Sequence, residues 1–456
     1  MTRGMLALLL AFALTALAGA VDAPLSAGTV QFVTRNGNQL MLDGHAYHFT
    51  GVNIYNANSD GWCWYDMRSG NALDDALNAI GRGKGAMRAW FFQPLATTNG
   101  QRDWSAFDHT ISVSAAHGDR VIVTLTDQWG ECGIGEDGGI SYYKTKDWYA
   151  NGYKSTDPAM LASYRNWVAE VVTRYKDSPT VLMWQLINEA EVKESEGAGC
   201  LPGTQSRDVL TAWASDVSGL IKSLDSNHLV SLGTIGGGQC GAQYTEYQDI
   251  HAISTIDVCE YHDYSPNSPM PGDQWNGLQF RIDQCNALNK PLFVGEVGIK
   301  PSDVGGTLQD RANALKAKFD AQLPTGIDGF LAWAWSNLGS TADNFDIGPS
   351  DPVLNVLDTF NLDTDGDGFS TGLEDLAGTD PLDACPDSVV DDAWPADINN
   401  DTFSDISDIV FLTGNFGAAV PPVPARYNVA PDPPDGFVDI TDISKLAGLF
   451  GQRCTP

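Results

Sequence analysis

Residues 181–189 read Val-Leu-Met-Trp-Gln-Leu-Ile-Asn-Glu, an almost continuously apolar run that ends in two polar side chains. A strand that is buried on both faces has this composition, because a parallel sheet carries helices on each side. Seven other runs are strand-like, and most of them are equally apolar: 47–54, 86–92, 120–127, 228–235, 256–264, 291–297 and 329–337. The chain therefore contains eight predicted strands.

Helical patterns separate these runs, for example at 158–175, 208–224 and 308–322. Eight buried strands joined by helices over roughly 310 residues predict an α/β fold, a (β/α)8 barrel of the TIM type. A β-hairpin over 28–49 is predicted to precede the barrel, because Asn36-Gly37 is a strong signal for a two-residue turn.

The composition restricts the partners of this chain. Its 456 residues correspond to about three domains, and a hydrophobic content of 43% excludes global disorder. Acidic residues outnumber basic ones by 58 to 26, which gives a formal net charge of −32. Nucleic acids and anionic membrane surfaces are therefore excluded as partners, since both require basic side chains. A neutral polymer or a bound cation remains compatible with this charge.

Residues 1–20 have the features of a secretory signal. Arg3 provides a positive start, residues 6–17 are apolar except for Thr15, and Ala18-Gly19-Ala20 fits a cleavage site. The alternative is a membrane anchor, but the apolar run is shorter than the roughly 20 residues that span a bilayer. We expect a secreted, soluble protein without a membrane partner.

Export makes disulfide bonds the expected state of the eight cysteines. Six of them lie between Cys63 and Cys285, and six cysteines allow 15 pairings, which the sequence does not resolve. Cys385 and Cys454 flank one acidic segment, so we predict that these two pair with each other.

In a (β/α)8 barrel the active site forms where the strands end. The ends of the predicted strands carry polar and aromatic side chains, namely Asn53, Arg88, Asp127 with Trp129, Asn188 with Glu189, His262 with Tyr264, Glu296, and Trp335. Two carboxyl groups on different strands, beside aromatic rings, indicate cleavage of glycosidic bonds, which requires one acid and one carboxylate. We expect Arg88 to keep Glu296 ionised, while burial and charge repulsion keep Glu189 protonated.

Over residues 28–345, these residues resemble glycoside hydrolase family 5, which contains cellulases and β-mannanases. The resemblance implies that Glu189 is the acid/base and Glu296 the nucleophile. It also implies roles in substrate binding: Asn188 for the sugar 2-hydroxyl, Arg88, His262 and Tyr264 for orienting the carboxyl groups, and Trp335 for the floor of the cleaved subsite. No cofactor is implied for catalysis.

The run 120–127 is followed by Trp129, whereas the cellulase branch usually ends this strand with histidine. An aromatic residue here, together with the opening residues 32–53, favours the mannanase branch, and we predict Trp129 as a substrate-binding residue. A cellulase of the same family remains the alternative, and a carbohydrate-binding barrel without catalysis is the alternative from another class. Glu191 and Glu260 are alternative candidates for the catalytic carboxyl groups. We expect Glu191 to be solvated, and Glu260 shares the strand face of His262.

The composition changes near residue 360, and 361–456 contains 18 acidic against 3 basic residues. We predict a catalytic domain over 21–360, a linking repeat over 361–390 and a duplicated domain over 391–456. The duplication is visible in the sequence, because Asp401-Thr-Phe-Ser-Asp-Ile recurs as Asp435-Gly-Phe-Val-Asp-Ile, 34 residues later.

The linking repeat contains a twelve-residue calcium loop with Asp363, Asp365 and Asp367 at positions 1, 3 and 5, and Glu374 at position 12. These residues offer oxygen ligands to Ca²⁺, and Gly368 permits the sharp turn between them. With the following Gly378-Thr-Asp380, the loop resembles the calcium-binding thrombospondin type 3-like repeats of exported bacterial proteins.

The duplicated domain offers a second, EF-hand-like loop with Asp397, Asn399, Asp401 and Asp408 at positions 1, 3, 5 and 12. Its duplication resembles dockerin domains, which implies a cohesin-bearing scaffold as partner. The second copy has Pro431 and Pro433 at positions 1 and 3, so calcium binding is doubtful there. A calcium-stiffened spacer or wall-attachment module remains the alternative.

Overall fold

The computed structural model describes residues 32–42, 45–61, 63, 65–81, 85–132, 143–359, 367–370, 373–374, 377–380, 383–386, 392–430 and 436–454. The predicted signal segment 1–20 and the predicted ligands Asp363 and Asp365 lie outside the described residues.

Eight parallel strands form one sheet, and each overlaps one of the eight predicted runs. They are β4 (Phe49–Asn53), β7 (Gly85–Trp90), β10 (Arg120–Thr124), β11 (Val181–Gln185), β12 (Leu229–Ser231), β13 (Cys259–Asp263), β14 (Leu292–Val297) and β15 (Gly329–Ala332). Their order is β12-β11-β10-β7-β4-β15-β14-β13, and a parallel bridge between Ser231 and Val258 joins the two edges. The predicted (β/α)8 barrel is therefore confirmed.

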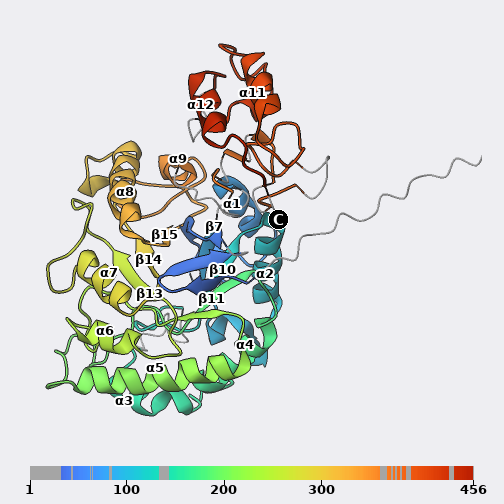
Figure 1. Cartoon of the computed structure of the whole chain (residues 1–456). Coiled ribbons are helices and arrows are strands. Elements are labelled where there is room, and N and C mark those ends of the chain that lie inside the picture. The colour runs from blue at the N-terminus through green and yellow to red at the C-terminus, as the bar shows by residue number, and fades with distance from the viewer. Residues whose placement is uncertain are drawn as a thin grey trace, which may run out of the picture. The chain divides into compact units, whose positions relative to one another are not determined.

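Helices surround this sheet (Figure 1). They are α1 (Ala72–Ile80), α2 (Ser105–His117), α3 (Lys146–Ala150), α4 (Tyr164–Tyr175), α5 (Gln205–Leu224), α6 (Glu246–His251), α7 (Leu278–Ala287), α8 (Leu308–Gln322) and α9 (Pro352–Thr359). The predicted helix 158–175 begins only at Tyr164, because the Ser163 side chain accepts a hydrogen bond from the Asn166 amide and caps the first turn. The predicted bounds of α8 are confirmed, and a capping box of Thr307 and Asp310 fixes its start.

Short elements complete the barrel region. Among the described residues of the barrel, short 3₁₀ helices span Gln93–Ala96, Gly152–Lys154, Pro301–Asp303 and Leu323–Thr325. Two small antiparallel pairs, β5 (Asp60–Gly61) with β6 (Tyr65–Asp66) and β8 (Thr97–Thr98) with β9 (Gln101–Arg102), lie in the loops after β4 and β7.

The predicted hairpin is present as β1 (Thr34–Asn36), β2 (Gln39–Leu42) and β3 (His45–Ala46), all antiparallel. Asn36 pairs with Gln39, so the two turn residues are Gly37 and Asn38, one position later than predicted. The reason is that Gly37 has a φ of +65°, the left-handed value favoured at the first central position of such turns.

The hairpin closes the amino-terminal end of the barrel. Val33, Leu40 and Tyr47 pack in one buried cluster with apolar residues from all eight strands or the positions beside them, including Phe49 and Phe293. The main-chain amide of Leu40 also donates to Asp328, just before β15. Because this end is filled with apolar side chains, the open mouth of the barrel lies at the carboxyl ends of the strands.

The C-terminal residues have an apolar core of their own, with Phe369, Leu373, Trp394, Leu412 and Leu446 at its centre. Its helices are α11 (Ile406–Thr413) and α12 (Ile440–Gly448), and Ala425–Tyr427 is a 3₁₀ turn. Both helices begin with a capping box, Asp405 with Asp408 and Asp439 with Asp442. The 34-residue repeat in the sequence is therefore a repeat in the structure.

Four disulfide bonds join the eight cysteines. The predicted pair Cys385–Cys454 is confirmed, and the other pairs are Cys63–Cys132, Cys200–Cys240 and Cys259–Cys285. None of the helices that the structure describes combines the length and the apolar character needed to cross a membrane.

Candidate active site

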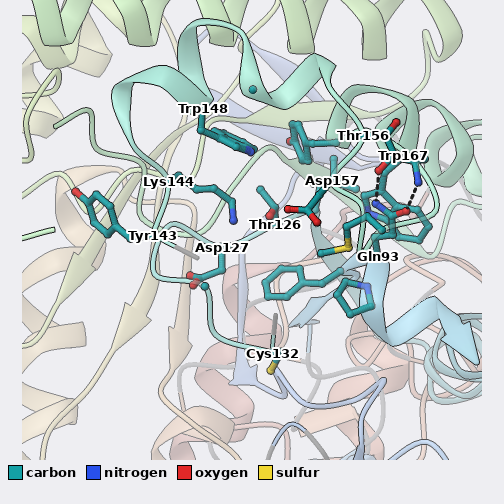
Figure 2. Close-up of a pocket in the computed structure, with 18 of the residues that line it drawn as sticks. Gln93, Thr126, Asp127, Cys132, Tyr143, Lys144, Trp148, Thr156, Asp157 and Trp167 are labelled. Atoms are coloured by element: carbon teal, nitrogen blue, oxygen red, sulfur yellow. Dashed lines mark hydrogen bonds between the residues drawn. The ribbon is translucent and has the colours of Figure 1, made fainter. Parts of the chain in front are cut away.

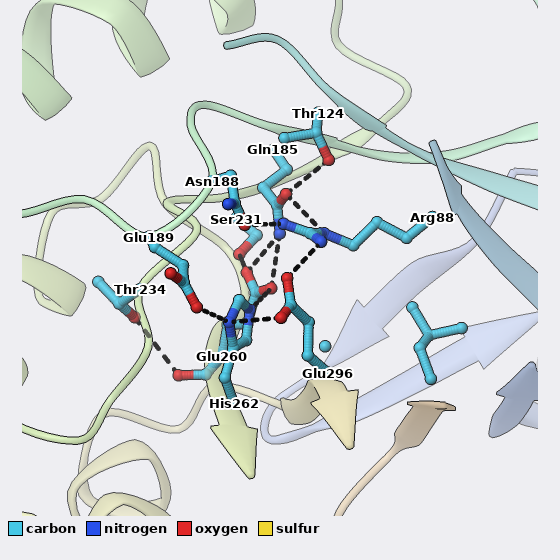
Figure 3. Close-up of polar contacts among 12 residues, drawn as sticks. Arg88, Thr124, Gln185, Asn188, Glu189, Ser231, Thr234, Glu260, His262 and Glu296 are labelled. Carbon is cyan, nitrogen blue, oxygen red and sulfur yellow. Dashed lines mark hydrogen bonds and ion pairs between the residues drawn. The ribbon is translucent and has the colours of Figure 1, made fainter. Parts of the chain in front are cut away.

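The polar strand ends converge at the mouth of the barrel (Figure 3). Arg88 lies on β7, Glu189 follows β11, His262 lies on β13, and Glu296 lies on β14. One carboxylate oxygen of Glu189, one of Glu296 and a ring nitrogen of His262 all lie within 4.8 Å of one another. Retaining glycosidases hold their two carboxyl groups about 5–5.5 Å apart, whereas inverting enzymes leave about 6.5–9.5 Å.

Glu189 leaves its strand with a φ of +60°, a left-handed backbone conformation that a non-glycine residue adopts only under local constraint. Its carboxylate accepts hydrogen bonds from Trp129 Nε1 at 2.7 Å and from His262 Nδ1 at 2.8 Å. Burial raises the pKa of Glu189, but these contacts outweigh it and the pKa is lowered. The direction of this pKa shift is opposite to the one expected from the sequence.

Glu296 accepts hydrogen bonds from Arg88 at 2.8 Å and from the Tyr264 hydroxyl. Burial raises its pKa, and the charges of His262 and Arg88 counteract only part of this effect. Arg88 was expected to keep Glu296 ionised, yet desolvation dominates because the carboxyl group is only 3% exposed. The pKa of Glu296 is thus also shifted in the direction opposite to the one expected from the sequence.

His262 is buried between the carboxyl groups. Burial lowers its pKa, but Glu296, Glu189 and Glu260 outweigh it and raise the pKa of His262 to about 10. Its Nδ1 is directed toward Glu189 and its Nε2 toward Glu260, and this arrangement favours the imidazolium cation, because only this form has a donor on both ring nitrogens.

Arg88 connects several of the predicted residues. It is fully buried and donates to Asn53 at 3.0 Å and to Asn188 at 2.6 Å, in addition to Glu296. Asn188 in turn donates to Asp127 at 2.8 Å, which fixes the orientation of its amide. The structure thus brings Arg88 and Asn188 into one network with the carboxyl pair.

Tyr264 and Trp335, two of the three aromatic residues predicted to bind substrate, differ in their exposure. Tyr264 is 39% exposed beside Glu296, as a substrate contact requires. Trp335 is only 3% exposed and its Nε1 donates to Asn337, so little of it is open to a sugar in this structure and its role as floor stays a prediction. β15 ends at Ala332, so the alternation of side chains between the two faces of the strand does not continue to Trp335. Trp333 is partly exposed instead and stacks on Tyr55 with ring centroids 5.1 Å apart.

Sequence reasoning missed Gln185, which lies inside β11 and accepts a hydrogen bond from Arg88 Nε at 2.9 Å. The available signal was one polar side chain within an otherwise apolar strand. Glu191, expected in solvent, is buried instead and pairs with Lys193 at 2.8 Å and with Tyr143 at 2.6 Å.

A cavity of about 410 Å³ lies beside the mouth and extends along the loops after β7 and β10 (Figure 2). Its wall includes Asp127, Lys144, Trp148 and Asp157. Burial raises the pKa of Asp127 to about 6 and lowers the pKa of Lys144. Since Asp127 also holds Asn188, this cavity shares a wall with the carboxyl site.

In the C-terminal module, Asp397 and Asp408 are buried and accept hydrogen bonds from main-chain amides of the same loop. Asn399 Oδ1 is buried and has no hydrogen-bond partner among the described residues. Burial raises the pKa of Asp397 and of Asp408, and neighbouring carboxylates raise both further. A cation would relieve this repulsion, so these residues fit Ca²⁺ in chemistry.

The carboxyl groups of Asp397, Asp401 and Asp408 are spread more widely than the ligand atoms at the barrel mouth. Among the described residues, the group of potential ligand atoms that lies within 4.8 Å consists of Glu189, His262 and Glu296. The side chains of Asp397, Asp401 and Asp408 therefore have to draw together around an ion. In the linking repeat, Glu374 is buried and Asp367 accepts from the Phe369 amide.

Comparison with known proteins gives a consistent result. The family model described as cellulase (glycosyl hydrolase family 5) matches residues 86–339, and a bacterial TSP3 repeat matches residues 363–384. Mannan endo-1,4-beta-mannosidase A of Hypocrea jecorina is 27% identical over 357 residues, which cover 70% of this chain and 73% of that protein. The enzyme of the same name from Emericella nidulans is 27% identical, with coverage of 70% and 82%.

Among solved structures, the endo-1,4-beta-mannanase from Rhizomucor miehei matches with a TM-score of 0.54 and 22% identity, over 72% of this chain and 97% of that chain. This likeness supports the fold. The site is that of a glycoside hydrolase, with two carboxyl groups opposed at the mouth of a (β/α)8 barrel. Because the family model covers more than half of its residues, the chain belongs to glycosyl hydrolase family 5.

Proposed function

We propose that this glycoside hydrolase is a retaining endo-β-1,4-mannanase in which Glu296 is the nucleophile and Glu189 the acid/base. The observation that carries the proposal is the opposed carboxyl pair, in which one oxygen of Glu189 and one of Glu296 lie within 4.8 Å of each other with His262 beside them. A short separation supports a retaining mechanism, because inverting enzymes hold their carboxyl groups about 6.5–9.5 Å apart to admit a water.

In the first step, Glu296 attacks the anomeric carbon while Glu189 gives its proton to the departing glycosidic oxygen. In the second step, Glu189 takes a proton from water, and the water oxygen replaces Glu296 on the sugar. Arg88 and Tyr264 hold Glu296 in place for the attack, since both donate to its carboxyl group. Trp129 and His262 hold Glu189 on the opposite side.

The preference for mannan rests on the relatives, which are named as mannan endo-1,4-beta-mannosidases. We expect kcat/KM on linear mannan to exceed that on carboxymethylcellulose and xylan by at least about tenfold, or roughly 1.4 kcal/mol of transition-state binding. Release of reducing ends from a panel of purified polysaccharides measures this preference. Higher activity on the cellulose derivative indicates a cellulase of the same family, and release from no polymer indicates a carbohydrate-binding barrel.

We also propose that the chain is exported through residues 1–20. The four disulfide bonds support this proposal, because such bonds persist in oxidising compartments outside the cytosol. Cleavage after this segment is checked by sequencing the amino terminus of the protein recovered from a culture medium.

For the C-terminal module, we propose calcium binding at Asp397, Asn399, Asp401 and Asp408, and docking to a cohesin-type scaffold. Apolar side chains at equivalent positions of both copies are 41–61% exposed: Phe403 and Phe437, Ile406 and Ile440, Phe416 and Phe450. An exposed apolar set of this kind is typical of a surface that binds another protein. The Asp363–Glu374 loop is proposed as a further calcium site, because it lies within the matched TSP3 repeat.

The substitution Asp408→Asn is expected to reduce calcium uptake by one ion per chain, because it removes the carboxylate at position 12. Isothermal calorimetry on the full-length, chelator-treated protein measures the stoichiometry. Asp442→Asn is the matched control, since Asp442 makes the same main-chain contacts in the second copy, whose loop has prolines at positions 1 and 3. Equal uptake by wild type and Asp408→Asn contradicts the proposed site; mannan hydrolysis is expected to stay unchanged in both variants.

A further inference from the structure

A third carboxyl group, Glu260, lies beneath the catalytic pair and is fully buried. We propose that Glu260 is a positioning residue of the reaction: it holds His262 as a cation against Glu189 and Glu296, and so sets the pH range in which Glu189 carries its proton. This inference rests on the proposed roles of Glu189 and Glu296.

The contacts of Glu260 are those of a carboxylate. Gln185 Nε2 lies 2.6 and 2.7 Å from its two oxygens, Ser231 Oγ lies at 2.8 Å, and His262 Nε2 lies at 3.1 Å (Figure 3). All three neighbours present a donor to it. These contacts fix the position of the Glu260 carboxyl group beside His262.

The orientation of Gln185 is not free to change. Its amide oxygen accepts from Arg88 Nε at 2.9 Å and from Thr124 Oγ1 at 2.6 Å, which leaves the amide nitrogen for Glu260. A continuous chain therefore runs from Arg88 through Gln185 and Glu260 to His262. Its two ends are the two cations that hold Glu296 and Glu189.

The backbone beside the nucleophile also makes room for Glu260. A Cβ atom on Gly295 would lie 2.2 Å from Glu260 Oε1, so only glycine allows β14 to pass the carboxylate at this point. Gly295 directly precedes Glu296. The position of Glu260 and the position of the nucleophile are therefore linked through one residue.

Glu260 affects the protonation of Glu189 and Glu296 through the balance of charges around His262. Among the described residues, the charged groups that face His262 are Glu189 after β11, Glu296 on β14 and Glu260 on β13, while Arg88 on β7 reaches it through Glu296. Two cations then face three carboxyl groups. Because burial penalises net charge, the cluster retains one proton on the pair Glu189 and Glu296.

In a variant without the charge of Glu260, the cations Arg88 and His262 balance the carboxylates Glu189 and Glu296. Both of these carboxyl groups can then be ionised without leaving a net charge. His262 also loses one of the three carboxylates that raise its pKa to about 10. Glu189 is then expected to lose the proton that it donates to the leaving oxygen at a lower pH than in wild type. An aryl mannoside with a dinitrophenolate leaving group is affected less, since this group departs without protonation.

The test compares Glu260→Gln with Ser231→Ala. Ser231→Ala removes a hydrogen bond to the same carboxylate but keeps its charge. We expect Glu260→Gln to move the basic limb of the kcat/KM profile on mannan down by at least about one pH unit, which is a tenfold loss at a pH on that limb. The dinitrophenyl mannobioside is expected to lose less than threefold, and Ser231→Ala is expected to leave the limb in place. An unmoved limb in Glu260→Gln, or an equal shift in Ser231→Ala, overturns the proposal.

A second readout does not depend on catalysis. The protonation of His262 is followed by ¹⁵N NMR of the histidine rings in the full-length protein, with His262→Gln used to assign the signal. We expect the midpoint to fall by at least about one pH unit in Glu260→Gln, and the same midpoint as in wild type overturns the proposal. Should Glu260→Gln fail to fold, the double swap Q185E/E260Q keeps donors and acceptors matched, and the midpoint of His262 is expected to fall there as well, because the carboxylate no longer contacts His262 Nε2. If Glu296 or Glu189 proves dispensable, the proposed function fails, while this titration still reports on Glu260.

Discussion

Replacing Glu296 by Gln is expected to lower kcat/KM on mannan by on the order of 10⁵-fold, or about 7 kcal/mol of transition-state stabilisation. The amide keeps the size of the side chain and its place beside Arg88 and Tyr264, but it does not attack the anomeric carbon. Initial rates of reducing-end release measure the loss. Because the shape is preserved, the fold and the binding of mannan are expected to stay close to those of wild type.

Glu191→Gln is the control for this experiment. Glu191 is another buried carboxyl group and follows the end of β11, but it pairs with Lys193 and Tyr143 and, among the described residues, its side chain makes no ion pair or hydrogen bond with a predicted site residue. Its replacement is expected to change the rate by less than about tenfold. Comparable losses in the two variants would show that burial of a carboxylate, and not nucleophilic attack, explains the result.

Replacing Glu189 by Ala is expected to lower kcat/KM on mannan by roughly 10³–10⁴-fold, the range for loss of general acid catalysis. The loss has a particular signature, because a dinitrophenyl mannobioside needs no proton in the first step and therefore still reacts with Glu296. Hydrolysis of the resulting intermediate is slow, since no base activates water. Added azide is expected to restore turnover and to give the β-mannosyl azide.

The same azide experiment separates the two carboxyl groups. In Glu296→Ala, azide enters from the face that the nucleophile has vacated and gives the α-azide. Product configuration is read by NMR. A β-azide from Glu296→Ala, or an α-azide from Glu189→Ala, would reverse the assigned roles.

The fold was predictable because a strand that is buried on both faces has an almost continuously apolar sequence. β11 illustrates this, since Val181–Gln185 is apolar apart from its last residue and every position is buried. The start of α4 was placed six residues too early, because a capping contact such as that of Ser163 depends on geometry more than on composition. The hairpin turn was misplaced by one residue for a similar reason, because Gly37 and its φ decide the register.

In the candidate site, Glu189, Glu296, Arg88 and His262 were predictable because they end buried strands in a barrel. The partnership of Gln185 and Glu260 was not, since it joins residues 75 positions apart that meet only after the strands are ordered around the barrel. Trp333 and Trp335 are two residues apart, and composition does not reveal which of them keeps an exposed face. The directions of the pKa shifts of Glu189 and Glu296 were not predictable, because they depend on burial and on contacts with His262 that exist only in the folded chain.

The most direct test of the account is the configuration of the first product. Hydrolysis of mannopentaose by a high concentration of enzyme is followed by ¹H NMR before the anomers equilibrate. Because one oxygen of Glu189 and one of Glu296 lie within 4.8 Å of each other, we predict the β-anomer first, through an intermediate on Glu296. The α-anomer as the first product would contradict a double displacement between these two carboxyl groups.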